Sequence, residues 1–208
     1  QRNRLLQNIK SGHRVAEAAI EPWTEKMIAL GNKIVSDRFR LIGELAGLLA
    51  PIYREYSGSN DEVRITIESQ VQPHHGEEAY WTALKNLKQR ERQLGVSLVG
   101  PHRDDLNISI NDRDLRDYGS RGEHKSVLIA LRLAELQFLK QKREETPVFL
   151  LDDCFSELDE TRERGVFFSF HGLGQMFLTS PRELGFLEEA VSSEISKYRV
   201  QNGVIEPL

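Results

Sequence analysis

The sequence of 208 residues predicts an α/β domain that follows a mainly helical arm. After residue 95, short apolar runs alternate with amphipathic helical stretches, which is typical of a layered domain with a parallel sheet. Before residue 95, apolar residues recur mostly at helical spacing. We therefore expect an arm domain at 1–94, with one strand near 62–70, and an α/β lobe at 95–208.

The composition is that of an ordinary globular protein, with 39% hydrophobic and 29% charged residues. No apolar run is long enough to span a bilayer, and the first ten residues lack the apolar core of a signal peptide. The single cysteine, Cys154, excludes an internal disulfide. We therefore expect a cytoplasmic protein without a membrane partner.

The arm begins with a long helical pattern in which apolar residues recur every seven positions, at Ile20, Met27, Ile34, Leu41 and Leu48. We expect this seam to pack in the core, flanked first by Trp23 and Leu30 and then by Leu45 and Ile52. This drift is that of an ordinary 3.6-residue helix, so a long coiled coil is not required. Pro22 is expected in the first helical turn and Pro51 at the end. The segment EVRITIE that follows alternates apolar and polar residues, as a half-buried strand does.

A second helix is predicted over 77–94, with leucines on one face and Lys85, Lys88 and Arg92 on the neighbouring face. A basic stripe of this kind is usually a solvated flank. The alternative is that it binds DNA phosphates.

Each element of the lobe follows from a short pattern. SLVG, NISIN and RDLRDY are strand-like, and a long amphipathic helix with a polar, glycine-bearing start covers 120–145. Strands are then predicted at TPVFLLDD and QMFLTSP, and helices at DETRERGVFFSF and PRELGFLEEAV. Near the end, Gln201, Asn202 and Gly203 indicate a hairpin turn.

The apolar strand that ends in Asp152 and Asp153 carries the clearest chemical signal. Ligands of α/β sheets bind at the carboxyl ends of strands, and two adjacent carboxylates there need a compensating cation. A hydrated Mg²⁺ on a nucleotide phosphate is the best candidate. One carboxylate could hold the metal, and the other could orient the attacking water.

Further motifs surround this strand. Upstream, GSRGEHKS opens the long helix, and a serine and glycines at a helix start suit anions. Downstream, SELD follows the acidic pair, and the next strand ends in Thr179 and Ser180. This is the order of signature motif, Walker B, D-loop and switch position in ABC-type ATPases.

At this level of detail the chain resembles the RecF family of recombination mediators. The resemblance rests on GPHRDDL at 100–106, GSRGEHKS at 119–126, LRLAEL at 131–136 and LLDDCFSELDE at 150–160. QRNRLL at 1–6 is similar to the central region of the family. The ATPase heads of this family are similar to those of SMC proteins, so the lobe is expected to be the C-terminal part of an ABC-type ATPase lobe.

The resemblance implies a protein that binds ATP and Mg²⁺ and forms a homodimer on ATP. It also implies recognition of gapped DNA and cooperation with RecR and RecO to load RecA, with weak DNA-dependent ATPase activity. The residue roles it implies are catalysis by Asp153, metal binding by Asp152, nucleotide contacts from Ser120, Gly122, Glu123 and Thr179, and a D-loop that contains Ser156 and Asp159.

One departure from the family pattern is the missing P-loop, since GxxxxGK followed by Ser or Thr occurs nowhere. We therefore expect a C-terminal segment of a longer protein that is inactive as an ATPase alone. A second departure is Asp153 itself, which stands where many ABC enzymes have glutamate and is one methylene shorter, consistent with a slow, switch-like ATPase.

Two other classes of function remain open at this point. The chain could be a non-catalytic dimerisation or DNA-binding adaptor, in which case DNA binding would persist without nucleotide. It could also be a metal-dependent phosphohydrolase that uses Asp152, Asp153 and Asp159 directly, which would leave the GSRGEHKS helix unexplained.

Overall fold

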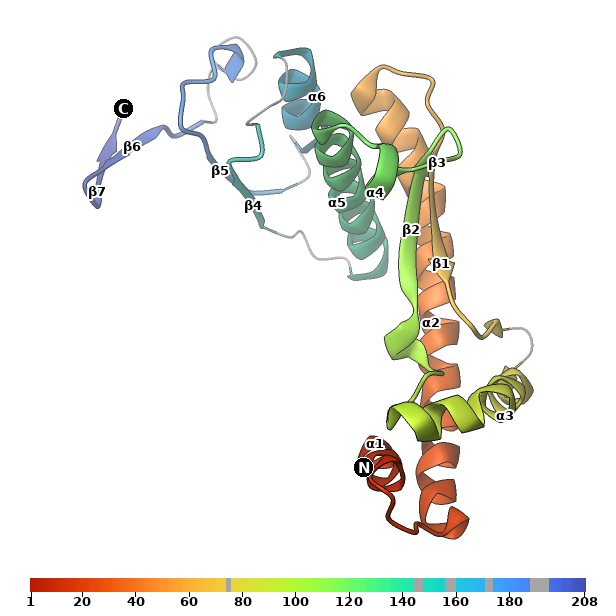
Figure 1. The fold of residues 1–208 in the computed structure, drawn as a ribbon. Coiled ribbons are helices and arrows are strands. Elements are labelled where there is room, and N and C mark those ends of the chain that lie inside the picture. Colours follow the sequence, from red (N-terminus) through yellow and green to blue (C-terminus); the bar gives the residue numbers. More distant parts are fainter. Residues whose placement is uncertain (74–75, 144–147, 156–159, 171–173, 188–194) are drawn as a thin grey trace. The chain divides into compact units, whose positions relative to one another are not determined.

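The computed structural model describes residues 1–208 except 74–75, 144–147, 156–159, 171–173 and 188–194 (Figure 1). The chain divides into a first compact unit, Gln1–Arg143, and a second, Glu144–Leu208. Residues 95–143 belong to the same unit as the helices before them. The boundary between arm and lobe near residue 95 rests on a change in the pattern of apolar residues and stays a prediction. None of the described helices is both long and apolar enough to cross a membrane.

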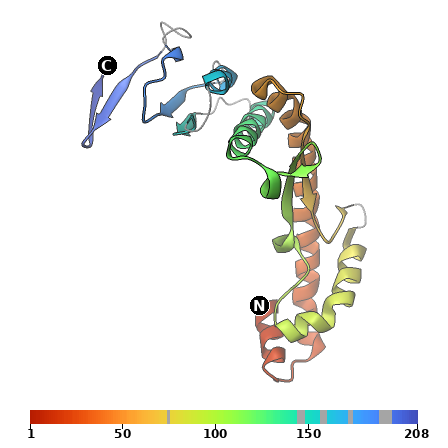
Figure 2. The same cartoon turned by 45° about the horizontal axis from the view of Figure 1, so that its top comes forward.

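Three helices make up much of the first unit: α1 (Arg2–Lys10), α2 (Glu17–Ser57) and α3 (Gly76–Leu94). The helix α2 has 41 residues, and α3 crosses its N-terminal half in both views (Figures 1 and 2). Neither proline of α2 lies where it was expected: Pro22 is in the second turn of a helix that begins at Glu17, and Pro51 does not end the helix, which continues to Ser57. A proline removes one backbone hydrogen bond, but the buried residues Ile52 and Tyr53 hold the following turn on the core.

The buried face of α2 is not the seven-residue seam that the sequence suggested. Ile20 is buried, but Ile34 and Leu41 are 43% and 39% exposed, whereas Val35 and Leu49 are fully buried. A straight α-helix has 3.6 residues per turn, so a strict seven-residue repeat drifts off the face that packs on the core. The core therefore moves to neighbouring positions along the helix.

The core beneath α2 and α3 contains six buried residues, namely Ile28, Val35, Val71, Tyr80, Leu84 and Val99. Gly31 of α2 lies directly against the Tyr80 ring. A Cβ at residue 31 would lie 2.8 Å from the Tyr80 hydroxyl oxygen and 3.3 Å from Pro101 Cδ. This glycine therefore allows α2 and α3 to approach closely.

Three antiparallel strands run along α2: β1 (Val63–Glu68), β2 (Asp105–Ile110) and β3 (Arg113–Asp114). The predicted strand EVRITIE is β1, which pairs Val63 with Ile110 and Glu68 with Asp105. A two-residue turn at Asn111 and Asp112, both with positive φ, joins β2 to β3.

The strand predictions before and after β2 were only partly right. SLVG is a loop that leads into the short 3₁₀ helix η2 (Pro101–Arg103), because Gly100 has φ of 134°. RDLRDY contributes the two residues of β3 and then forms α4 (Leu115–Tyr118), capped by the Asp114 side chain.

The long helix α5 (Arg121–Arg143) lies within the predicted 120–145 and packs against α2. Its buried residues recur at helical spacing, namely Ser126, Val127, Ile129, Ala130, Leu133, Ala134 and Leu136. The start of α5 is thereby fixed in the first unit.

The second unit contains the parallel strands β4 (Phe149–Asp152) and β5 (Met176–Thr179), with α6 (Glu160–Phe170) between them in sequence. Its aromatic core includes edge-to-face contacts of Phe186 with Phe155 and Phe167. This strand–helix–strand order confirms the predicted α/β alternation. The last predicted helix, 181–191, is wrong at its start, because residues 181–185 form bends and a turn, and residues 188–191 lie outside the described part of the chain.

The chain ends in a hairpin of β6 (Tyr198–Gln201) and β7 (Val204–Pro207). Asn202 and Gly203 form its turn with φ of 52° and 79°, as the sequence predicted.

Candidate functional site

The start of α5 is a capping box built from Ser120 and Glu123. The backbone N–H of Glu123 donates to Ser120 Oγ at 3.2 Å, and the backbone N–H of Ser120 donates to Glu123 Oε2 at 2.7 Å. The two side chains thereby satisfy backbone donors that every helix start leaves open. The Ser120 hydroxyl still has a proton to donate, and Gly122 adds no side chain over the helix end. Such a start suits an anion.

Gly119 fixes the approach to this helix start. A Cβ there would lie 2.5 Å from the Leu115 carbonyl oxygen and 2.8 Å from His124 Cε1. The His124 ring in turn places Nδ1 2.9 Å from the Ser120 carbonyl oxygen. The glycine is needed because the α4 turn and the His124 ring occupy the space where a side chain would lie.

The acidic pair lies at the carboxyl end of β4, as predicted, beside Thr179 at the carboxyl end of the parallel strand β5. Asp152 and Thr179 are partners in the strand register, and Thr179 Oγ1 donates to Asp152 Oδ1 at 2.5 Å. The backbone N–H of Asp153 donates to the same hydroxyl at 3.1 Å. Asp153 has φ of 45°, a left-handed backbone conformation that is uncommon for a residue other than glycine. All three residues are exposed.

The structure therefore joins three of the predicted residues, Asp152, Asp153 and Thr179, in one hydrogen-bonded group. Ser120 and Glu123 form another group in the first unit. The D-loop residues Ser156 and Asp159 lie outside the described residues. Among the described residues, no group of three or more His, Cys, Asp or Glu side chains could hold a metal ion by itself.

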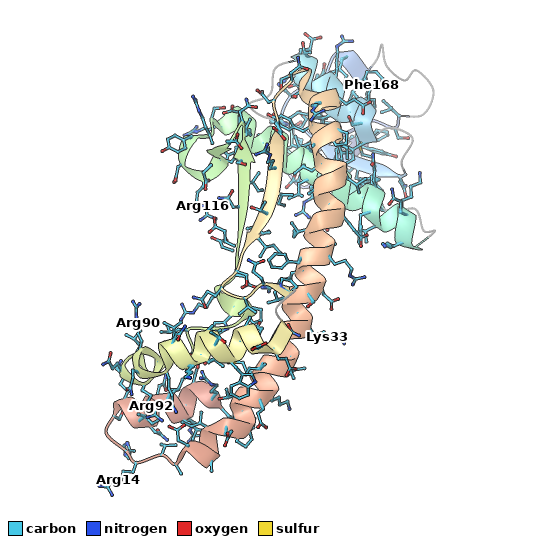
Figure 3. All side chains as sticks on the ribbon, turned by 90° about the vertical axis from the view of Figure 1, so that its right-hand side faces the viewer. Arg14, Lys33, Arg90, Arg92, Arg116 and Phe168 are labelled. Carbon is cyan, nitrogen blue, oxygen red and sulfur yellow. The ribbon has the colours of Figure 1, made fainter. Side chains whose placement is uncertain are left out.

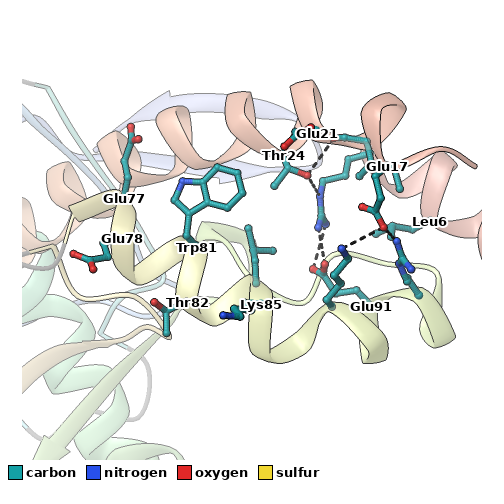
Figure 4. Close-up of a pocket in the computed structure, with 15 residues that line it drawn as sticks. Leu6, Glu17, Glu21, Thr24, Glu77, Glu78, Trp81, Thr82, Lys85 and Glu91 are labelled. Carbon is teal, nitrogen blue, oxygen red and sulfur yellow. Dashed lines mark hydrogen bonds and ion pairs between the residues drawn. The ribbon is translucent and has the colours of Figure 1, made fainter.

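The predicted basic stripe on α3 is partly neutralised within the chain. Lys88 Nζ lies 3.2 Å from Glu17 Oε1 of α2, and Arg92 forms an ion pair with the same carboxylate. Together with Lys85, these residues line a groove of about 780 Å³ between α1, α2 and α3, in which the Trp81 indole is exposed (Figure 4).

The floor of this groove is a buried ion pair that the sequence reasoning missed. Arg2 donates to both carboxylate oxygens of Glu91, at 3.2 and 2.5 Å, and to Thr24 Oγ1 (Figure 4). It also donates to Ser97 Oγ at 2.6 Å. The backbone N–H of Leu98 donates to Glu91 Oε1 at 2.7 Å. The sequence does contain a signal for this ion pair: Glu91 lies on the apolar face of α3, where a charged side chain needs a buried partner.

Comparisons with known proteins agree with these motifs, although no family model matches the chain. DNA replication and repair protein RecF from Herpetosiphon aurantiacus is 34% identical over 208 residues, which is all of this chain and 54% of that protein. The protein of the same description from Halothermothrix orenii is 32% identical over 212 residues, 99% of this chain and 56% of that protein. The chain thus spans about half the length of the curated relatives it matches.

Solved structures give the same result. The structure of the recombination mediator protein RecF with ATP in the RecFOR pathway superposes with a TM-score of 0.79 at 25% identity, over all of this chain and 54% of that one. The RecF structure with ATPγS gives 0.80 at 25% identity, over all of this chain and 55% of that one. An SMC ATPase, 13% identical with a TM-score of 0.51 over 83% of this chain and 87% of that one, shares the fold.

These relatives cover the whole chain, and the ABC-type fold of their ATPase heads agrees with a long helix at α5 and a strand–helix–strand unit at β4, α6 and β5. The chain therefore belongs to the RecF family of DNA replication and repair proteins and matches their C-terminal part.

Proposed function

We propose that this chain supplies the signature helix and the acidic strand of an ATP-gated, DNA-binding recombination mediator of the RecFOR pathway. The observation that carries the proposal is the group formed by Asp152, Asp153 and Thr179 at the ends of two parallel strands. Carboxylates and a hydroxyl at this edge of a sheet are the groups that a nucleotide phosphate and its metal need.

The residues present fit a hydrated Mg²⁺, which would neutralise phosphate charge when bound. Asp152 uses one carboxylate oxygen to accept the Thr179 hydrogen bond, and no other described residue bonds its second oxygen. That second oxygen is the group that would hold the ion or one of its waters. Thr179 orients the carboxylate, in the way that outer residues orient metal ligands.

Asp153 is assigned the role of orienting the attacking water. Its carboxylate is exposed, and its own N–H is held by Thr179, so the backbone next to the carboxylate is fixed. A carboxylate that accepts a proton from water acts as a general base. Ser120 and Gly122, at the capped start of α5, are assigned to a phosphate of the nucleotide carried by a second copy.

The partners proposed with this function are DNA with a gap or a single-strand junction, RecR, RecO and a second copy of the protein. Support comes from the solved structure of RecF with ATP, a recombination mediator protein of the RecFOR pathway. Lys85 is the member of the basic stripe for which the described part of the chain shows no ion pair. It is therefore the first candidate for a DNA phosphate contact.

Dimerisation tests the role of Ser120. In a full-length RecF protein that has this chain as its C-terminal part, Ser120→Arg should abolish the ATP-dependent dimer, because a bulky cation would occupy the phosphate position. Nucleotide binding to the same protomer should persist. Ser120→Ala is the matched control, since it loses the same cap, at about 1 kcal/mol, without adding bulk. Sedimentation that shows unchanged ATP-dependent dimers in Ser120→Arg would contradict the assignment.

A further inference from the structure

Two residues of the seven-residue repeat on α2, Ile34 and Leu41, lie outside the core, and with Trp23 and Leu30 they form an apolar stripe on the helix surface. Its exposed members are Trp23, Leu30, Ile34 and Leu41, at 37%, 54%, 43% and 39% exposure. They are separated by seven, four and seven residues, which is the spacing of a and d positions in a coiled coil. This set is called the α2 stripe below.

Cations follow the stripe along one side. If Met27, Ile34 and Leu41 are a positions, Lys26, Lys33 and Arg40 occupy the preceding g positions, where coiled coils place their interhelical charges, and Asp37 occupies the d position between Ile34 and Leu41. Arg40 pairs with Asp37 at 3.0 Å, whereas Lys26 and Lys33 form no ion pair with any described residue. Lys33 lies near the middle of α2 (Figure 3).

From this stripe and its charges, we propose that α2 binds an acidic amphipathic helix of another protein, packed along Trp23, Leu30, Ile34 and Leu41. The apolar stripe provides the seam, and Lys26 and Lys33 select glutamates or aspartates beside the partner's own seam. A helix is the fitting partner, because a partner helix with the same seven-residue repeat can contact all four residues of the α2 stripe over several turns.

A second copy of the same helix fits poorly because it would bring like charges together. In a parallel pair, Lys33 of one copy would face Arg38 of the other, and in an antiparallel pair the lysines would face one another. Like charges at these positions oppose pairing. DNA fits poorly as well, since phosphates are bound by cations and give no role to four exposed apolar side chains.

A designed peptide tests the α2 stripe. The probe is a fluorescent amphipathic helix of about three heptads, with leucine and isoleucine in its seam and glutamate beside it. A second probe has lysine in place of every glutamate. Anisotropy titrations against this chain should show binding of the acidic peptide and at least about tenfold weaker binding of the basic one.

Two paired variants make the test specific. The double variant Leu30→Ser, Ile34→Ser should bind the acidic peptide about tenfold more weakly, or weaker still. The matched control, Leu106→Ser, alters a leucine that is 44% exposed on β2 and should change nothing. Lys26→Glu with Lys33→Glu should reverse the preference, so that the basic peptide binds better. Circular dichroism confirms that each variant keeps its helices.

The reversed preference is the decisive result. Failure of the acidic peptide to bind, or binding that survives both double variants, would overturn the proposal. A dimer of the unmodified chain that becomes a monomer in the Leu30→Ser, Ile34→Ser variant, as measured by sedimentation, would also overturn the proposal, because a second copy would then cover the stripe. Loss of binding to a DNA duplex in that apolar variant would likewise assign the stripe to nucleic acid and overturn the proposal.

Discussion

Replacing Glu91 with alanine tests how the first unit is held together beneath the groove. The change leaves the Arg2 guanidinium, whose side chain is 11% exposed, without the carboxylate 2.5 Å away, and leaves the Leu98 N–H without its acceptor. Breaking a buried ion pair by removing one partner typically costs about 3–5 kcal/mol. We expect a loss near the lower end, roughly 3 kcal/mol, because Arg2 lines the open groove and water can reach it.

Urea unfolding followed by tryptophan fluorescence measures this loss. Both tryptophans, Trp23 and Trp81, lie in the first unit, so the signal reports on that unit alone. Glu17→Ala is the matched control, because it also removes a carboxylate that holds cations on α3, but at the surface, where ion pairs contribute about 0–1 kcal/mol. Glu91→Gln should fall between the two. Equal losses for Glu91→Ala and Glu17→Ala would refute the reasoning.

The remaining predictions concern the core, the acidic pair and the basic stripe. Burial, with the nearby charge of Asp104, raises the pKa of Tyr80 to about 12 from 10.0. The contribution of the protonated Tyr80 to the free energy of unfolding should therefore be fully present below pH 10 and be lost between pH 10 and 12. Tyr80→Phe should remove that part of the decline in alkaline unfolding curves. It should also reduce the destabilisation by Gly31→Ala, which is about 1–3 kcal/mol in the unmodified background, since the 2.8 Å contact is with the hydroxyl. In the full-length protein, Asp153→Asn should lower ATP turnover by roughly 10²-fold or more while ATP binding is kept, and unchanged turnover would remove Asp153 from the mechanism. Reversing Lys85, Lys88 and Arg92 to glutamate should weaken binding to all DNA sequences alike, whereas Glu17→Gln should strengthen it by freeing two cations. Unchanged affinity in both would identify the stripe as a solvated face.

The acidic strand was predictable because its signals are local. Four apolar residues before Asp152 indicate a strand, and a serine and glycine before a long amphipathic pattern indicate a helix start. The burial expected of that strand is wrong, since Val148 and Leu150 are 56% and 77% exposed. The Ser120–Glu123 capping box also follows from spacing alone, yet it was interpreted only as a nucleotide contact. In the structure, the Ser120 and Glu123 side chains accept hydrogen bonds from backbone N–H groups at the start of α5 and thereby cap the helix.

The features that were missed depend on contacts across the chain. The pairing of Arg2 with Glu91 spans 89 residues, and local spacing carries no information about it. Along α2, the predicted drift of the seam toward Leu45 and Ile52 is confirmed, but Ile34 is exposed because α3, β1 and α5 pack against other positions. Pro51 was expected to end the helix, but tertiary packing of Ile52 and Tyr53 outweighs one lost hydrogen bond.

The central claim is that this chain provides one part of a composite ATP site and depends on a P-loop supplied by another segment. Calorimetry with Mg-ATP tests it most directly, first on the chain alone and then after mixing with a separately produced N-terminal part of a RecF protein. We expect no measurable binding to the chain alone, because backbone amides and the lysine of a P-loop supply most phosphate contacts in this architecture. We expect the mixture to bind more tightly than the N-terminal part by itself, and to lose that gain with Ser120→Arg. Tight binding of Mg-ATP by the chain alone would contradict the account.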